Sequence, residues 1–299
     1  MTARAVKTLA MSLGFDACGI ARAGAVDEEA VARYDRWIAE GRHDTMEWAV
    51  RWRDVRNDPR LLLEGARSLI VVALNYYPAR FQPPEAPQVA AYAYGRDYHK
   101  VLRRMVKPLV RALEAEGHAA RVCVDSAPLR ERYWAQRAGL GFVGRNNQLI
   151  IPGRGAYFFL GTIVTTALLD TDEPCRLQCP EGCHRCEEAC PAHALHEGEA
   201  VDARRCLSCL TIEHRGPLPP GTAAVLGNRV FGCDECLKAC PMNRHATATT
   251  VSEFAPGDAL LSLTSDTLVA LDEARFDALF GHTPLRRAGL AALRRNLGL

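Results

Sequence analysis

The stretch CRLQCPEGCHRCEEACP, residues 175–191, decides the organisation of this 299-residue chain, because it holds five cysteines in seventeen positions. Residues 183–191 have the spacing Cys-x2-Cys-x3-Cys-Pro, and residues 233–241 repeat it. In bacterial ferredoxins this spacing binds [4Fe–4S] clusters, and the cysteine before proline ligates the other of two clusters. The two halves therefore predict a ferredoxin-like domain that holds two [4Fe–4S] clusters.

This crossing pattern predicts which cysteines share a cluster. The first cluster is predicted to bind Cys179, Cys183, Cys186 and Cys240. The second is predicted to bind Cys190, Cys206, Cys233 and Cys236. Three residues, Pro-Glu-Gly, separate Cys179 from Cys183 where the ferredoxin run has two, so Cys175 remains a rival for the first position. Structural zinc and disulfides are the alternatives, but neither explains two Cys-Pro endings at matching offsets.

The remaining composition indicates an ordinary globular protein. Cys18 and Cys123 lie in apolar surroundings and are expected to be small buried side chains, whereas Cys209 has no predicted role. The formal net charge of +2 permits a nucleic-acid partner without requiring one. We see no signal peptide and no run of about eighteen apolar residues. We therefore expect a cytoplasmic protein with reduced thiols.

The sequence pattern divides the chain into three predicted parts. Residues 1–174 alternate helical and extended segments, which predicts a mixed α/β (α+β) domain. Residues 175–245 form the ferredoxin-like domain, and residues 246–299 are expected to be a short helical tail. Helices are predicted over 5–14, 28–41, 97–117 and 128–140, with a kink near Pro108. Strands are predicted over 67–77, 120–126, 147–152 and 156–169.

Outside the cysteines, the segment VDSAPLRER (124–132) places Asp125 after a predicted strand, where ligands of α/β proteins gather. Taken alone, Asp-Ser-Ala-Pro is also typical of a helix N-cap. His99 begins like a motif that supplies an axial ligand to some cobalamins, but Leu102 occupies the glycine position of that motif. We therefore predict that His99 lies on a helix face. The C-terminal arginines are candidates for phosphate contacts: Arg286, Arg287, Arg294 and Arg295.

Longer stretches resemble one known family, the epoxyqueuosine reductases. Most are specific to that family rather than to ferredoxins, and they occur in the family's order. They are NDPRLLLEGARSLIVVALNYY (57–77), YGRDYHKVLRRM (94–105), VDSAPLRERYWAQRAGLGFVGRN (124–146), YFFLGTIVTT (157–166), ARRCLSCLTIEHRG (203–216) and GNRVFGCDECLKACPMNRHAT (227–247).

The resemblance implies that the N-terminal domain binds cobalamin and that the chain reduces epoxyqueuosine to queuosine at the wobble position of tRNA. It implies Asp125 as the proton donor, a role for which we expect a raised pKa. The implied corrin contacts are Arg56, Gln148, Leu149, Ile150, Ile151 and Ser208. Implied partners are tRNA, with Arg215 and the basic tail as candidate contacts, and an external electron donor that the sequence does not identify. We expect no membrane contact and a monomer.

Two other functions are compatible with the cluster motif. A reductive dehalogenase shares the plan of cobalamin with two clusters, but such enzymes usually carry a twin-arginine signal, which is not seen here. A plain electron-transfer protein would contain iron and sulfide but no cobalamin. The VDSAP and LTIEHRG stretches favour the reductase over both alternatives.

Overall fold

The computed structural model describes residues 1–196 and 198–298, and in them a four-stranded sheet forms the centre of the N-terminal part. The strand order is β1-β2-β7-β4, and every neighbouring pair is antiparallel. The bounds are β1 Ala17–Arg22, β2 Ser68–Asn75, β7 Phe158–Thr165 and β4 Ala120–Cys123. The predicted mixed class is confirmed, in its antiparallel α+β form.

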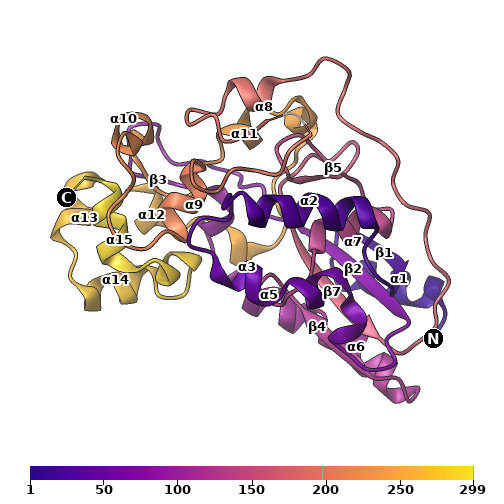
Figure 1. The fold of residues 1–299 in the computed structure, drawn as a ribbon. Helices are drawn as coiled ribbons and strands as arrows, with labels where there is room; N and C mark the ends of the chain where they lie inside the picture. Colours follow the sequence, from indigo (N-terminus) through magenta and orange to yellow (C-terminus); the bar gives the residue numbers. More distant parts are fainter. Residues whose placement is uncertain (197, 299) are drawn as a thin grey trace.

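Helices cover both faces of this sheet (Figure 1). Alternate residues of β2 enter two separate cores: Ile70, Val72 and Leu74 face α1, α5 and α6, and the intervening residues face α7. Because both faces are covered, every residue of β2 is buried, which explains its nearly continuous apolar sequence. The helices are α1 Ala3–Ser12, α2 Glu28–Ala39, α3 Glu47–Arg51, α4 Arg53–Asn57, α5 Tyr98–Met105, α6 Lys107–Ala115 and α7 Glu131–Arg137.

The long helix predicted over 97–117 is interrupted as expected. It divides at Val106 into α5 and α6, and Pro108 occupies the first turn of α6, where its missing N–H costs nothing. The strand predicted over 120–126 ends earlier, at Cys123, because Asp125 adopts a left-handed backbone conformation with φ of 50°. Asp125 therefore lies in a loop between β4 and α7. Strand β1 was not predicted.

Short elements make up the cluster region. The hairpin strands are β5 Phe142–Val143 and β6 Leu149–Ile150, and the parallel pair is β3 Gln88–Val89 with β8 Arg229–Phe231. The helices here are α8 Arg185–Glu188, α9 Leu207–Ile212, α10 Thr222–Leu226 and α11 Glu235–Lys238. The 3-10 turns are η1 Pro59–Leu61, η2 Ala91–Ala93, η3 Pro241–His245, η4 Ser252–Phe254 and η5 Pro284–Arg287.

The C-terminal residues are mostly helical, as predicted. Their helices are α12 Asp258–Leu261, α13 Ser265–Ala270, α14 Glu273–Phe280 and α15 Gly289–Asn296. Figure 1 shows α13, α14 and α15 gathered at the end of the molecule away from the large sheet. They share a core with β3, η2 and β8, so residues 89–94 of the first predicted part pack with the tail. The boundaries after residues 174 and 245 stay predictions.

Among the described residues, no helix is long and apolar enough to cross a lipid bilayer.

Candidate active site

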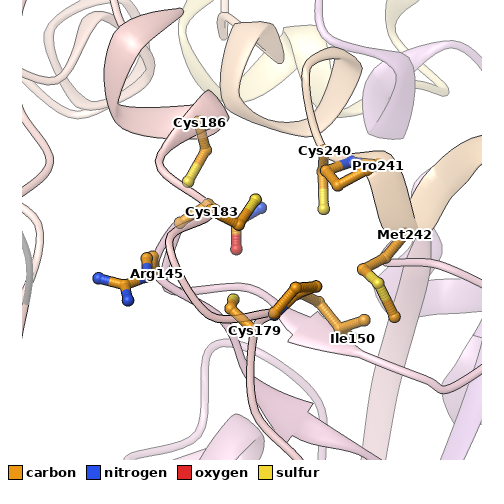
Figure 2. Close-up of a pocket in the computed structure, with 10 residues that line it drawn as sticks. Arg145, Ile150, Cys179, Cys183, Cys186, Cys240, Pro241 and Met242 are labelled. Carbon is orange, nitrogen blue, oxygen red and sulfur yellow. The ribbon is translucent and has the colours of Figure 1, made fainter.

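The thiols predicted to bind the first cluster surround one hollow. Cys179, Cys183, Cys186 and Cys240 line it together with Arg145, Ile150 and Met242. Figure 2 shows the sulfur atoms directed into this common space from the loop 179–186 on one side and from Cys240 on the other. Among the described residues, no group of three or more His, Cys, Asp or Glu side chains forms a site for a single metal ion. The four thiols enclose a space instead.

The Pro-Glu-Gly insertion between Cys179 and Cys183 forms a bulged loop. The amide of Cys183 donates to the carbonyl of Pro180 at 3.1 Å, and Gly182 has a φ of 67°. The insertion thus folds into an exposed turn that keeps Cys179 at the hollow. Cys175 is not among the residues that line the hollow, and its amide and carbonyl are hydrogen-bonded to Gln136. This geometry favours Cys179 as the first ligand.

The second predicted set is also brought together. Burial, with the nearby thiols of Cys206, Cys233 and Cys190, raises the pKa of Cys236. Cys206 precedes α9, where amides of that helix hydrogen-bond to its sulfur, and the amide of Ala194 donates to Sγ of Cys190 at 3.3 Å. Such N–H donors stabilise thiolate sulfur and tune the potential of a bound cluster. The four thiols of the first set therefore line one hollow, and those of the second set lie within electrostatic range of Cys236, while the ligand assignment itself stays a prediction.

The remaining thiols lie outside these groups. Burial raises the pKa of Cys18 and of Cys123 to about 12, in agreement with their predicted apolar surroundings. Cys209 is half-buried beside Cys206 and Asp44. All twelve cysteines are free thiols, so the disulfide alternative finds no support in this structure.

Asp125 is the end of a hydrogen-bonded chain in which His99 links it to Asp97. Nε2 of His99 lies 3.1 Å from Oδ2 of Asp125, and Nδ1 of His99 lies 2.8 Å from Oδ1 of Asp97. Asp97 is the N-cap of α5 and accepts a hydrogen bond from the His99 amide. The same carboxylate oxygen therefore holds both the start of the helix and the imidazole of His99. The ring stacks on Tyr98, which itself hydrogen-bonds to Asp125. His99 lies on helix α5, as predicted, and its ring also bonds to Asp97 and Asp125, which was not predicted.

The pKa of Asp125 differs from the value expected from the sequence. Burial raises its pKa, but the hydrogen bond and the positive charge of His99 outweigh burial, so the pKa of Asp125 is lowered. Burial lowers the pKa of His99, but its bonds to Asp125 and Asp97 outweigh burial and raise that pKa to about 9. The raised pKa expected for Asp125 is therefore wrong: at neutral pH the proton resides on His99.

Glu131, the first residue of α7, is a second acid at this site. Its Oε1 accepts from the amide of Asp125 at 3.0 Å. Burial, followed by the negative charge of Asp125, raises the pKa of Glu131 to about 8. Its carboxyl therefore also holds a proton at neutral pH. Sequence reasoning missed both His99 and Glu131, although their motifs, YGRDYH and VDSAPLRER, each lie within a stretch that resembles the family.

The predicted corrin contacts lie on three elements. Arg56, on α4, stacks over Trp48 with its guanidinium carbon 4.7 Å from the ring centroid, and it lies within electrostatic range of Asp125 and Glu131. Its Nε atom is buried with no hydrogen-bond partner among the described residues. Ser208 lies two residues after Cys206, in the first turn of α9 and next to the second group of thiols.

The third element is the segment from Gln148 to Ile151. Ile150 lines the hollow of the first cluster, whereas Leu149 and Ile151 are buried against the helical layer that contains α7. The side chains of Leu149 and Ile151 are therefore enclosed by protein. A corrin can contact this segment through its main chain or through Gln148, which is half-buried.

The predicted basic residues of the C-terminus separate into two groups. Arg287 and Arg295 lie with Arg215 at one open hollow. Arg294 donates to the carbonyls of Val269 and Leu271, so its guanidinium holds the tail together. Arg286 is exposed, with its Nε 4.0 Å from the Asp277 carboxylate.

Two family models match the chain. Residues 56–126 match the model described as "Epoxyqueuosine reductase QueG, DUF1730", and residues 175–243 match "4Fe-4S double cluster binding domain". The second match covers all eight predicted cluster ligands, and the first ends one residue after Asp125.

Relatives with curated names agree over nearly the whole chain. An epoxyqueuosine reductase of Gloeobacter violaceus is 42% identical, covering 99% of this chain and 94% of the relative. That of Xanthomonas campestris pv. campestris is 38% identical, covering 98% of this chain and 84% of the relative. A solved epoxyqueuosine reductase with an epoxyqueuosine-modified tRNA-Tyr stem loop superposes with a TM-score of 0.87 at 28% identity, covering 98% of this chain and 79% of that chain.

Identity at this level over nearly the whole chain decides against the two alternatives considered from the sequence. The chain carries the domain for two [4Fe–4S] clusters and is an oxidoreductase. It belongs to the epoxyqueuosine reductase family.

Proposed function

We propose that this chain reduces epoxyqueuosine to queuosine in tRNA, and that Asp125 delivers the protons. The observation that carries the proposal is the chain of Asp97, His99 and Asp125 in a molecule that also gathers two groups of four thiols. Family membership supplies the substrate, since the solved relative bound to an epoxyqueuosine-modified stem loop shares this fold.

The residues present suit both kinds of cofactor. Two groups of four neighbouring thiols suit two [4Fe–4S] clusters, whose irons each take one cysteine thiolate. For cobalamin, the buried and unpartnered Nε of Arg56 is a donor that needs an acceptor, and a corrin carries amide oxygens on its rim. Gln148 and Ser208 would complete the contacts. When bound, the clusters and cobalamin supply the two electrons of the reaction.

The chemistry requires protons as well as electrons. Reduction of an epoxide to an alkene breaks both C–O bonds, takes up two electrons and two protons, and releases the oxygen as water. The chain's own part is to bring protons to that oxygen. The Asp125 carboxylate is the exposed end of the hydrogen-bonded chain, since 44% of the Asp125 side chain is accessible and its Oδ2 is bonded to His99.

The two protons have identifiable sources beside Asp125. His99 holds one on Nε2, from which it donates to the Asp125 carboxylate, and Glu131 holds another on its carboxyl. Asp125 then acts as the relay: it accepts a proton from His99 and passes it to the departing oxygen. Asp97 stabilises the charged imidazole, so His99 can take up a new proton from solvent after each transfer.

Partners follow from this reaction. The substrate is a tRNA with a queuosine-type anticodon, and we propose a cytoplasmic location because tRNA acts there. Electrons come from an external donor of unknown identity. We further propose that the monomeric chain is divided at residues 174 and 245 into catalytic, cluster and tail parts.

The test is direct. The full chain, reconstituted anaerobically with iron, sulfide and cobalamin, is given a chemical reductant and an epoxyqueuosine-containing anticodon stem loop, and the nucleosides are identified by mass spectrometry. We expect queuosine to appear, and we expect none from Asp125→Asn with the same cofactor content. Unchanged epoxyqueuosine with both clusters and cobalamin in place would refute the proposed function.

A further inference from the structure

An open basic hollow lies between the loop after α9 and the start of α15. Arg215, Arg287 and Arg295 line it, and no Asp or Glu is among the described residues on its wall. Ala288, Ala291 and Ala292 form its floor on the α15 side. Small side chains at these positions leave the space open, so the guanidinium groups surround a volume that protein atoms do not fill.

The wall of this basic hollow is held by specific contacts. His214 is fixed on both sides, with Nδ1 2.9 Å from Oδ2 of Asp44 and Nε2 3.1 Å from the carbonyl of Pro217. Arg295 donates to the carbonyls of Leu210, His214 and Gly216, which joins α15 to the loop. The cations are therefore positioned before any ligand arrives, and pre-organisation lowers the entropic cost of binding.

Positive charge in the basic hollow exceeds negative charge. Glu213, just outside the wall, accepts from Arg287 at 2.7 Å and is the carboxylate that pairs with it. Arg215 is exposed and donates to a neutral carbonyl, that of Ile212, at 3.1 Å. Burial, followed by the charge of Arg215, lowers the pKa of Arg295. Two like charges at short range, with one acid for three arginines, favour an anion in this space.

The basic hollow adjoins the proposed active site. After the hydrogen bonds and charge of His99, the charge of Arg287 contributes to the low pKa of Asp125. The amide of Asp97 donates to the carbonyl of His282 at 2.9 Å, which joins the start of α5 to the segment before η5. Tyr92 lies within electrostatic range of Asp125, Arg287 and Glu213. An anion in the basic hollow is thus held near the group that delivers protons.

We infer that the basic hollow formed by Arg215, Arg287 and Arg295 binds a backbone phosphate of the RNA next to the modified nucleotide. The inference rests on the proposed function. Guanidinium groups bind phosphate oxygens through paired N–H donors, and such contacts fix the register of a nucleic acid without reading its sequence. Arg215 and Arg287 supply these donors, whereas Arg295 contributes charge, because its N–H groups are hydrogen-bonded to Leu210, His214, Gly216 and Asn296. A phosphate anchored here would hold the flanking backbone while the modified base reaches Asp125.

The experiment measures RNA binding separately from turnover. Binding of a synthetic anticodon stem loop with an unmodified wobble guanosine to the full, cluster-loaded chain is followed by fluorescence anisotropy over a series of KCl concentrations. For Arg215→Ala we expect the Kd to rise about tenfold at low salt, and the slope of log K against log [KCl] to shrink by about 0.7. Arg286→Ala is the matched control, since Arg286 is exposed but does not line the basic hollow.

A second variant should change the affinity for RNA in the opposite direction. Glu213→Gln releases Arg287 from its ion pair, so it should tighten RNA binding several-fold. Two results would overturn the inference: Arg215→Ala with an unchanged Kd and salt slope, or Arg286→Ala with the same loss as Arg215→Ala. Iron content and far-UV circular dichroism of each variant show that the fold and clusters are intact.

Failure of the proposed function gives a different result. A wild-type chain that binds the stem loop with the expected salt slopes but never reduces epoxyqueuosine contradicts the function and leaves the phosphate site standing. A chain that reduces epoxyqueuosine while Arg215→Ala binds normally contradicts the phosphate site alone.

Discussion

The imidazole of His99 joins α5 to the loop after β4, with Nε2 3.1 Å from Oδ2 of Asp125, 26 residues further along the chain. This contact lowers the pKa of Asp125 and raises that of His99 to about 9. A lone catalytic carboxyl would have to hold its own proton. Here the acid is the pair of His99 and Asp125: His99 holds the proton, and Asp125 passes it on.

Asp125→Asn removes the negative charge that stabilises the His99 imidazolium. We expect the pKa of His99 to fall from about 9 toward its ordinary value near 6.5, because a nearby carboxylate is what favours the charged ring. NMR titration of the His99 ring protons in the apo and cluster-loaded chain measures this directly. A pKa of His99 that stays near 9 would show that Asp97 alone sets it.

His99→Asn removes the proton source and leaves Asp125 in place. We expect kcat to fall by about 10²-fold at neutral pH, the usual contribution of a positioned acid. Wild-type activity should also decline as the pH rises through about 9, where His99 loses its proton, and the variant should lack this decline. His118→Asn, on the same domain, serves as control. A pH profile shared by wild type and His99→Asn contradicts the role given to His99.

Glu131→Gln tests the second proton. The folded-state pKa of Glu131 is raised from 4.5 to about 8, so between these values the folded chain holds a proton that the unfolded chain has released. The contribution of protonated Glu131 to the free energy of unfolding is therefore fully present below pH 4.5. It falls by up to about 1.4 kcal/mol per pH unit as the pH rises through this window.

Glutamine cannot ionise, so the variant should lose this component of the pH dependence while keeping the hydrogen bond to the Asp125 amide. Calorimetric Tm values at several pH values inside the window measure the difference. Glu114→Gln, an exposed position on α6, gives the background slope. Parallel Tm curves for wild type and Glu131→Gln would mean that Glu131 is ionised in the folded chain.

Cys179→Ala and Cys175→Ala separate the two rivals for the first cluster position. Because Cys179 lines the hollow and Cys175 does not, we expect Cys179→Ala to lose about four of the eight irons of two cubanes. Cys175→Ala should keep them all. Iron and sulfide analysis with EPR of the reduced protein measures the outcome, and the reverse pattern would assign Cys175 as the ligand.

Local sequence predicted much of this molecule. The two Cys-Pro motifs, the apolar strand β2 and the division of the helix near Pro108 each depend on residues that are neighbours in the chain, so spacing alone reveals them. Strand β1 was missed because Gly19 at its centre weakens the pattern; there a Cβ would lie 2.0 Å from the carbonyl of Ala138, so packing with the end of α7 decides the residue.

Tertiary structure decided the charges and the surroundings of the site. The pKa of Asp125 depends on an imidazole from another element, and the basic hollow needs the loop after α9 together with α15, about 80 residues apart. Likewise β3 pairs with β8 and carries part of the N-terminal sequence into the C-terminal core. Sequence determines which groups are present and which lie on the same turn or strand. The strength of an acid or a cation depends on burial and on charges brought close by folding, and these distances exist only in three dimensions.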